Sequence, residues 1–402
     1  MTKRILFVDD EPMVLNGLER SLRAMRKEWE MKFVSSGAEA LETMAQAPFD
    51  VVVSDMRMPV MDGAALLEQV KAKYPRTVRF VLSGQSDKEA ILRSVGPTHQ
   101  YLSKPCDPEE LKQKITHAFA LRELLVNPTL KDIVSRMRAI PSLPSLYVAV
   151  TEALSQPDAS VAKIADIIKQ DMGMTSKVLQ LVNSAFFGLP CQVSSPHQAV
   201  SLLGIDNIRA LVLSVHVFSE LETDSKRSLD FLWPHSLSTA ACARAIARAE
   251  RGGQRLEDDS FAAGLLHDIG RLILACACGV LYAQALTRAA EQKINLIETE
   301  MQTFGCTHAE VGAYLLGLWG LPDSVVAAVA WHHFPSRSGV DAFSPVIAVH
   351  VADNYDHHQN SYLEMNEIPS LDEDLLGRLG LLQRLTDWSR TCDEIMRNGE
   401  NQ

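Results

Sequence analysis

The sequence has little of the chemistry that marks nucleic-acid-binding or secreted proteins. Basic residues are outnumbered, with 39 Lys and Arg against 50 Asp and Glu, and the formal net charge is -11. Because affinity for nucleic acids comes largely from Lys and Arg that neutralise phosphates, nucleic acid is an unlikely partner. Seven cysteines occur without a paired CxxC zinc pattern. Their odd number leaves at least one outside any disulfide, which favours a reducing compartment.

Long uninterrupted hydrophobic runs are also missing. The segment MTKRILFVDDEP has four apolar residues before its acidic residues, which is too few for the core of a signal peptide. The most apolar later stretch, residues 261–286, is interrupted by His267, Asp268 and Arg271, so its composition does not favour a membrane span. We therefore expect a cytoplasmic protein with no membrane partner.

The chain does contain enough apolar residues for more than one core. It has 402 residues, of which 47% are hydrophobic and 22% charged, as in folded globular proteins. A chain of this length exceeds the size that one hydrophobic core usually supports, so we expect roughly two to three domains.

Two kinds of hydrophobic pattern divide the sequence. Up to about residue 120, short apolar runs alternate with amphipathic stretches, which is typical of a parallel sheet covered by helices. The predicted strands are residues 5–8, 32–34, 51–54, 78–82 and 100–102, with helices over 63–73 and 108–121. Beyond residue 127 only helical patterns remain, separated by Pro and Gly breaks. The predicted fold class is α/β plus all-α, with a doubly wound five-stranded parallel sheet followed by a helical domain.

The expected domain boundaries follow these changes of pattern. We predict a first domain over residues 1–122, a linker helix over 123–132, a helical domain over 133–335 and a helical extension of that domain over 336–402. His357 and His358 fall in a polar part of the extension and are expected to be solvated.

Polar side chains follow the predicted strands at the points where the strands end. Asp9 and Asp10 come after the first strand and Asp55 after the third, while Ser83 and Lys104 follow the fourth and fifth. The carboxyl ends of parallel strands meet at one edge of a sheet, so these side chains should converge. Crowded carboxylates favour a bound Mg²⁺, and one of them could then be the nucleophile that accepts a phosphoryl group.

Residues 3–122 closely resemble the receiver domains of response regulators, because VDDEP, SDMRMPVMDG, VLSG and YLSKP occur in the order and spacing of that family. The resemblance implies a flavodoxin-like fold with Asp55 as the phosphoacceptor. It also implies that Asp9, Asp10, Asp55 and the backbone carbonyl of Arg57 bind Mg²⁺.

By the same resemblance, Ser83 and Lys104 contact the phosphoryl oxygens and Tyr101 is the aromatic switch residue; simple packing is an equally open interpretation of Tyr101. Phosphorylation would add about -1.5 to -2 charges and shift the fourth helix, fifth strand and fifth helix. The resemblance implies a bacterial phosphoprotein with a sensor histidine kinase or phosphotransfer protein as its partner. Homodimerisation through the receiver is a further expectation.

A second group of candidate ligands lies in the helical region. The run AAGLLHDIGRLIL places His267 beside Asp268 in an apolar stretch, where burial without a partner would be costly. The other candidates are His235, His308, His332 with its neighbour His333, and Asp353. Imidazoles with a few carboxylates suit a divalent transition metal, which could activate water for phosphoester hydrolysis. Hydrogen-bonded histidines in a helical core, without metal, are the alternative.

These residues resemble the HD phosphohydrolase superfamily, and the runs DMGMTSKVLQLVNSAFFG and AVSLLGIDNIRALVLS more closely resemble its HDOD subfamily, over about residues 130–335. HDOD domains are regulatory output modules. The resemblance therefore implies a non-catalytic domain that acts through a protein partner or a small signalling ligand.

An enzymatic alternative stays open because the candidate ligands of the HD superfamily are retained. It is a phosphorylation-gated, metal-dependent phosphohydrolase. Relatives that cleave cyclic-di-GMP carry Gly-Tyr-Pro after the His pair, whereas this sequence reads HHFPSRSGVDAFSP, and Arg271 replaces the usual Lys. These differences disfavour cyclic-di-GMP as a substrate.

Overall fold

A computed structural model was used to describe the fold. The described residues are 3–83, 98–104, 106–124, 127–137, 144–156, 159–183, 192–205, 208, 231–359 and 370–399. The expected fourth helix of the first domain and most of the segments NSAFFG and DNIRALVLS lie outside these residues.

The first domain is the predicted five-stranded parallel sheet, in the order β2-β1-β3-β4-β5. Its strands are β1 (Lys3–Val8), β2 (Trp29–Val34), β3 (Val51–Asp55), β4 (Val78–Ser83) and β5 (Gln100–Ser103). Its helical segments are α1 (Pro12–Ser21), η1 (Arg23–Lys27), α2 (Gly37–Gln46), α3 (Gly63–Lys73) and α5 (Pro108–Leu124). Every residue of β3 and β4 is buried, as expected for central strands with helices on both faces.

Local capping explains where two of the receiver helices begin. The side chain of Ser36 accepts a hydrogen bond from the backbone N–H of Glu39 at the start of α2, and Asp62 accepts one from Ala65 at the start of α3. Such caps satisfy amide groups that have no partner within the helix. The predicted helix over residues 63–73 is confirmed with the same bounds.

The second part of the chain is helical, as predicted. Its segments are α6 (Pro128–Arg136), α7 (Pro144–Ser155), α8 (Val161–Ile168), α9 (Met172–Val182), α10 (Pro196–Leu203), α13 (Leu232–Ala249), α14 (Gly253–Leu266), α15 (Ile269–Gln292), α16 (Leu296–Phe304), α17 (His308–Leu318), α18 (Asp323–Trp331), η3 (Pro335–Ser338), α19 (Pro345–Gln359), α20 (Glu373–Arg378), η4 (Leu382–Arg384) and α21 (Leu385–Gly399). Helix α13 contacts α14, α19 and α21, and α17 contacts α15 and α18.

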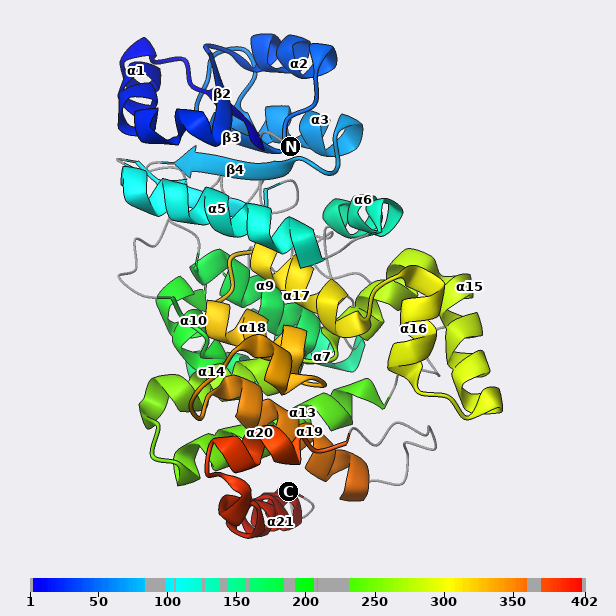
Figure 1. The fold of residues 1–402 in the computed structure, drawn as a ribbon. Coiled ribbons are helices and arrows are strands. Elements are labelled where there is room, and N and C mark those ends of the chain that lie inside the picture. Colours follow the sequence, from blue (N-terminus) through cyan, green and yellow to red (C-terminus); the bar gives the residue numbers. More distant parts are fainter. Residues whose placement is uncertain are drawn as a thin grey trace.

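Helix α5 lies between the sheet and the helical domain, and α6 follows it at the edge of the receiver (Figure 1). The predicted linker, residues 123–132, contains the end of α5 and the start of α6. Between them, the side chain of Asn127 accepts a hydrogen bond from Leu130 N–H and donates one to the carbonyl of Phe304. Asn127 therefore caps α6 and attaches it to the end of α16.

Direct contacts join the receiver to α17. Gln100 Nε2 at the start of β5 donates to the carbonyl oxygen of Gly317 at 3.1 Å. A Cβ atom at Gly317 would lie 2.5 Å from Cδ2 of Leu121 on α5, so the absence of a side chain allows this close approach. The Ser135 hydroxyl of α6 lies 3.2 Å from the Tyr314 hydroxyl of α17.

Helices α15 and α17 also cross at glycines. A Cβ atom at Gly270 would lie 1.8 Å from the backbone oxygen of His308, and Gly312 faces the backbone of Gly270 from the other helix. The crossing brings the first turn of α15 against the first turn of α17. These two turns carry candidate ligands.

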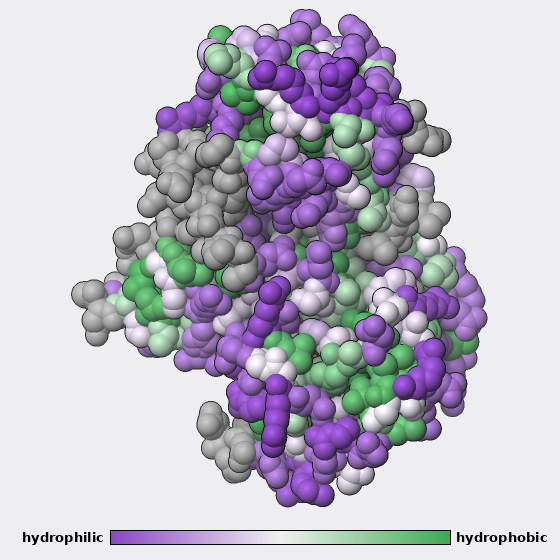
Figure 2. All heavy atoms as spheres, turned by 60° about the vertical axis from the view of Figure 1, so that its left-hand side comes forward, coloured by the Kyte–Doolittle hydropathy of each residue, from purple (hydrophilic) through white to green (hydrophobic). Residues whose placement is uncertain are grey.

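Among the described residues, one stretch, Gly253–Gln292, is long and apolar enough to cross a membrane by composition alone. It consists of α14 and α15, and 56% of its most apolar window is buried inside the protein. Figure 2 shows hydrophobic patches scattered among hydrophilic side chains on one face of the molecule. Because more than half of the window is buried inside the protein, Gly253–Gln292 is only weak evidence for a membrane span.

Replacing Gly270 by Ala should destabilise the helical domain. The new methyl group would overlap backbone atoms of α17 that cannot move independently, so we expect a loss of at least about 2 kcal/mol in the free energy of unfolding. Gly377→Ala, at an exposed position of α20 with one side-chain atom 3.3 Å from the new Cβ, is the matched control. Urea unfolding followed by tryptophan fluorescence measures both; equal midpoints for the two variants would contradict the packing argument.

Candidate functional site

Strand register brings the predicted receiver residues to one edge of the sheet. Val8 of β1 pairs with Ser54 of β3, so Asp9 and Asp55, which follow them, lie side by side. Ser83 ends β4 opposite Ser103 of β5. The next residue, Lys104, donates its backbone N–H to the carbonyl of Ser83.

Lys104 joins the two acidic residues. Its Nζ lies 2.7 Å from Oδ2 of Asp9 and forms a second ion pair with Oδ1 of Asp55. Asp9 and Asp55 are only 1% and 6% exposed, so water screens these charges little. Asp10, next to Asp9, is half-buried.

The loop after β3 packs against Asp55. Asp55 Oδ2 accepts a hydrogen bond from the backbone N–H of Arg57 at 2.9 Å. A Cβ atom at Gly63 would lie 2.2 Å from the backbone oxygen of Asp55, so only glycine lets the start of α3 approach this closely. The motif DMRMPVMDG thus forms a loop whose first and last residues, Asp55 and Gly63, lie side by side.

Burial and the ion pair act against each other on Asp55. Burial raises its pKa, and although Lys104 opposes this effect, the pKa stays above its usual value. Burial lowers the pKa of Lys104, but the hydrogen bonds it donates to Asp55 and Asp9 outweigh that effect and raise the pKa. Carboxylate and carbonyl oxygens are the ligands Mg²⁺ prefers, so the residues at this edge fit that ion. Ser83 and Tyr101 are buried here, at 3% and 4% exposed.

The candidate ligands of the helical domain come from five separate segments. His235 lies in α13, His267 and Asp268 at the junction of α14 and α15, His308 at the start of α17, His332 at the end of α18, and Asp353 in α19. The structure brings all of them together in one cluster, and each is at most 1% exposed.

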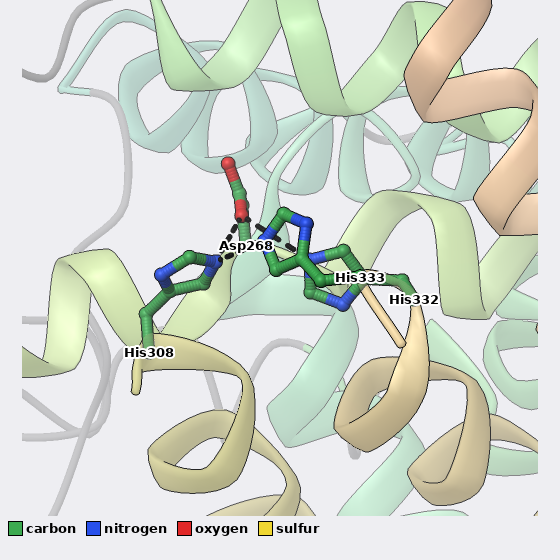
Figure 3. A group of neighbouring side chains, drawn as sticks. All are labelled: Asp268, His308, His332 and His333. Carbon is green, nitrogen blue, oxygen red and sulfur yellow. Dashed lines mark hydrogen bonds and ion pairs between the residues drawn. The ribbon is translucent and has the colours of Figure 1, made fainter. Parts of the chain in front are cut away.

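Asp268 and Asp353 lie at the centre of the cluster. Asp268 Oδ1 is 3.1 Å from His308 Nε2 and 3.9 Å from His332 Nε2. Asp353 Oδ1 is 3.2 Å from His235 Nε2 and 3.6 Å from the Nε2 of His267. Figure 3 shows the Asp268 carboxylate between the ring of His308 and the rings of His332 and His333. These residues form overlapping groups whose ligand atoms could hold a metal ion.

The imidazoles point their Nε2 atoms inward because Nδ1 is already bonded outside the cluster. His267 Nδ1 donates to the carbonyl of Gly264 at 2.7 Å, and His332 Nδ1 donates to Val329 at 2.8 Å. Nδ1 of His235 and of His308 each donate to a carboxylate instead, at 2.7 Å. Such outer hydrogen bonds set the tautomer that leaves Nε2 free to bind a metal.

Several inward-facing atoms lack a satisfactory partner. Nε2 of His332 and both oxygens of Asp268 and of Asp353 make no hydrogen bond of acceptable geometry within the described part of the chain, although ring nitrogens lie close to the oxygens. A buried polar atom left in this condition costs about 1–3 kcal/mol. A cation among them would remove that cost, so the residues present fit a metal ion.

The charges of the cluster also favour a cation. Four carboxylates, those of Asp268, Glu300, Asp353 and Asp356, are at most 1% exposed. Arg271, whose Nε lies 3.0 Å from Asp268 Oδ2, is the buried guanidinium beside them. With neutral imidazoles the cluster would be strongly negative, and such buried charge requires compensation.

Two of the histidines are held neutral. Burial, together with the neighbouring His267, lowers the pKa of His332 to about 3. Burial and the adjacent His332 bring the pKa of His333 well below its usual value. A neutral imidazole is the form that binds a metal.

Two other histidines are paired with carboxylates and behave differently. Burial lowers the pKa of His235, but the adjacent carboxylates of Asp353 and Asp356 outweigh that effect and raise the pKa to about 10. Burial also lowers the pKa of His308, but the negative charge of Glu300 acts in the opposite direction. The resulting pKa is about 9, above the usual value. Without a metal these two histidines are therefore protonated, and a metal would replace their protons.

The prediction that His357 is solvated is wrong. It lies on α19 at 8% exposed, with Nδ1 3.0 Å from Asp353 Oδ1. Its spacing of four residues from Asp353 places both on one face of a helix, which could have revealed the contact. Glu300 and Asp356 were also missed. No local pattern connects Glu300, on α16, to His308 on the next helix.

An open pocket of about 390 Å³ reaches the cluster at His333. Its lining residues are His333, Phe334, Ser370, Leu371, Asp372, Glu373 and Asp374. His350 connects the pocket wall to the cluster, because its Nδ1 donates to the carbonyl of His332 at 2.6 Å and its Nε2 accepts the backbone N–H of Asp372 at 2.9 Å. A ligand entering here would meet acidic side chains first.

Comparison with known families agrees with this two-part arrangement. Residues 5–116 match the response regulator receiver domain. Residues 140–335 match the HDOD domain. The protein is accordingly a response regulator with an N-terminal receiver and a C-terminal HDOD domain, as the sequence motifs predicted.

Individual relatives match parts of the chain. An uncharacterized protein of Treponema pallidum is 33% identical over 205 residues, which are 50% of this chain and 39% of that protein. The hydrogenase transcriptional regulatory protein HoxA of Cupriavidus necator is 34% identical over 116 residues, 28% of this chain and 23% of HoxA. The chain thus spans well under two thirds of these relatives. The response regulator MmoQ of Methylococcus capsulatus superposes with a TM-score of 0.45 and 25% identity, over 60% of this chain and 98% of MmoQ.

Proposed function

We propose that a sensor histidine kinase or phosphotransfer protein phosphorylates Asp55, and that phosphorylation switches a regulatory HDOD output domain. The observation that carries this proposal is the half-buried Lys104 that bridges the buried carboxylates of Asp9 and Asp55 at the carboxyl edge of the sheet. The output acts through a protein partner or a small signalling ligand. The free cysteines among the described residues favour a reducing compartment, and we propose the bacterial cytoplasm.

In the phosphoryl transfer, a carboxylate oxygen of Asp55 attacks phosphorus and the bond to the donor breaks. Mg²⁺ would be held by Asp9, Asp10, Asp55 and the backbone carbonyl of Arg57, and would supply positive charge for the phosphoryl oxygens. Lys104 Nζ, already paired with Asp55, would then pair with the negatively charged phosphoryl oxygens. Ser83, at the end of the adjacent β4, would donate its hydroxyl.

The phosphoacceptor assignment predicts that acetyl phosphate with Mg²⁺ labels the protein and that Asp55→Asn abolishes the label. Asp62→Asn is the control, because Asp62 caps α3 in the same loop and Asn caps a helix about as well. Intact-mass spectrometry measures the added phosphoryl group. A label retained by the Asp55→Asn protein would exclude Asp55 as the acceptor.

Helix α17 offers the path by which phosphorylation reaches the output domain. Its last turn contacts Gln100 and Leu121 of the receiver, and its first residue, His308, lies in the His/Asp cluster. Eleven residues at 1.5 Å per residue give a rigid element of about 16 Å between the two. Gln100 precedes Tyr101, the proposed switch residue, in β5. If the receiver forms a homodimer through the face of α5 that carries Leu121, the second receiver would have to displace α17 from that face.

This coupling predicts that Gln100→Ala uncouples the domains. The variant loses the hydrogen bond to Gly317 but keeps every residue of the phosphorylation site. Hydrogen exchange of α17 should change on acetyl phosphate treatment in the parent protein, and this change should shrink several-fold in Gln100→Ala while labelling of Asp55 persists. Lys112→Ala, at a partly exposed position of α5, is the control. An unaltered α17 response in Gln100→Ala would exclude this path.

The second candidate function is a phosphorylation-gated, metal-dependent HD-type phosphohydrolase. The convergence of His235, His267, Asp268 and Asp353 with His308 and His332 favours it, because these side chains could hold a divalent transition metal. Binding of such a metal is part of the proposal whether the domain is regulatory or catalytic.

The pocket at His333 favours the regulatory interpretation. Asp372, Glu373 and Asp374 line it, and like charges at an opening disfavour anionic ligands such as phosphoesters. Burial opposes ionisation of Asp372, but the hydrogen bond from Ser336 brings its pKa below the usual value, so this carboxylate is charged. A phosphoester would approach against this charge.

Metal analysis and a hydrolysis assay together separate the two functions. We expect the purified protein to hold a divalent transition metal, Asp268→Asn to lose it, and Asp258→Asn, near the surface of α14, to keep it. We expect no cleavage of bis-p-nitrophenyl phosphate or cyclic dinucleotides by the metal-loaded protein, phosphorylated or not. Cleavage that is lost in Asp268→Asn but kept in Asp258→Asn would establish the hydrolase instead.

A further inference from the structure

Two buried carboxylates lie immediately outside the His/Asp cluster, and each contacts the outer nitrogen of one histidine. Glu300 of α16 accepts the Nδ1–H of His308, and Asp356 of α19 accepts the Nδ1–H of His235, both at 2.7 Å. Both carboxylates are 0% exposed. Neither reaches the centre of the cluster, where Asp268 and Asp353 lie.

Each carboxylate is itself held by further hydrogen bonds. Glu300 Oε2 also accepts the backbone N–H of His308 at 2.8 Å, and its Oε1 accepts the hydroxyl of Tyr282 at 3.1 Å. Asp356 Oδ1 accepts the hydroxyl of Ser238 at 2.5 Å. Both side chains are therefore fixed before any metal arrives.

We propose that Glu300 and Asp356 are positioning residues that set the metal affinity of the cluster by orienting His308 and His235. A carboxylate on the outer nitrogen makes an imidazole a stronger ligand than a carbonyl does, and losing it typically weakens metal binding by about 10- to 100-fold. The Nδ1 atoms of His267 and His332 donate to backbone carbonyls instead. Of the two carboxylate-backed histidines, His308 lies beside Asp268 and His235 beside Asp353.

This inference rests on the proposed metal site, and the test separates the two. The dissociation constant for Co²⁺ is measured on the full chain by competition with a chromophoric chelator, together with the visible spectrum of the bound ion. Glu300→Gln and Asp356→Asn keep the shape of each side chain and remove its charge. Glu298→Gln, two residues away on the exposed side of α16, is the matched control.

We expect Glu300→Gln and Asp356→Asn each to weaken Co²⁺ binding about 10- to 100-fold and to shift its visible bands, with Glu298→Gln unchanged. Wild-type affinity in both variants would overturn the positioning role while leaving the metal site intact. A parent protein that binds no Co²⁺ would overturn both.

A purely structural role is tested with Tyr282→Phe, which loses the outer bond to Glu300 but keeps the carboxylate on His308. We expect its Co²⁺ affinity to stay within about threefold of the parent. A loss as large as that of Glu300→Gln would overturn the proposal, because it would follow from packing alone. Asp356→Asn provides an independent measurement if Glu300→Gln fails to fold.

Discussion

The burial of carboxylates next to cations is the constraint on which both halves of this protein depend. Asp9 and Asp55 in the receiver, Asp268 in the HDOD domain and Asp353 in the helical extension that follows it have almost no access to water. A buried charge is tolerated only when another charge or a set of hydrogen bonds compensates for it. The chain therefore supplies a positively charged side chain to each site, Lys104 in the receiver and Arg271 in the helical cluster.

The receiver does this with a flexible side chain. Lys104 pairs with both Asp9 and Asp55, so neither carboxylate is left alone before Mg²⁺ and the phosphoryl group are present. In the helical cluster the compensation comes partly from Arg271 and partly from His235 and His308, whose pKa values are raised beside carboxylates. Under the proposed function, a metal ion would take over this compensation at each site.

Much of this arrangement was predictable from the sequence, for physical reasons. Strand ends are visible as apolar runs, and parallel strands end at one edge, so Asp9, Asp55 and Lys104 could be placed together before the fold was known. The helical cluster was harder. Its ligands come from helices whose crossing angles depend on side-chain packing, and Glu300 reaches His308 through tertiary contacts that no periodic pattern encodes. His357 was misplaced because a polar neighbourhood hid its position on the buried face of α19.

Glycine decides how closely these pieces approach one another, and this connects the two sites. Gly270 lets α15 meet the first turn of α17, beside the ligands, and Gly317 lets α5 of the receiver meet the last turn. A helix packed tightly at both ends cannot shift at one end without a response at the other, since packed interfaces have few alternative arrangements. A change at β5 would therefore reach the contact at Gly317 first, and His308 lies at the other end of the same helix. This is the physical basis of the proposed coupling.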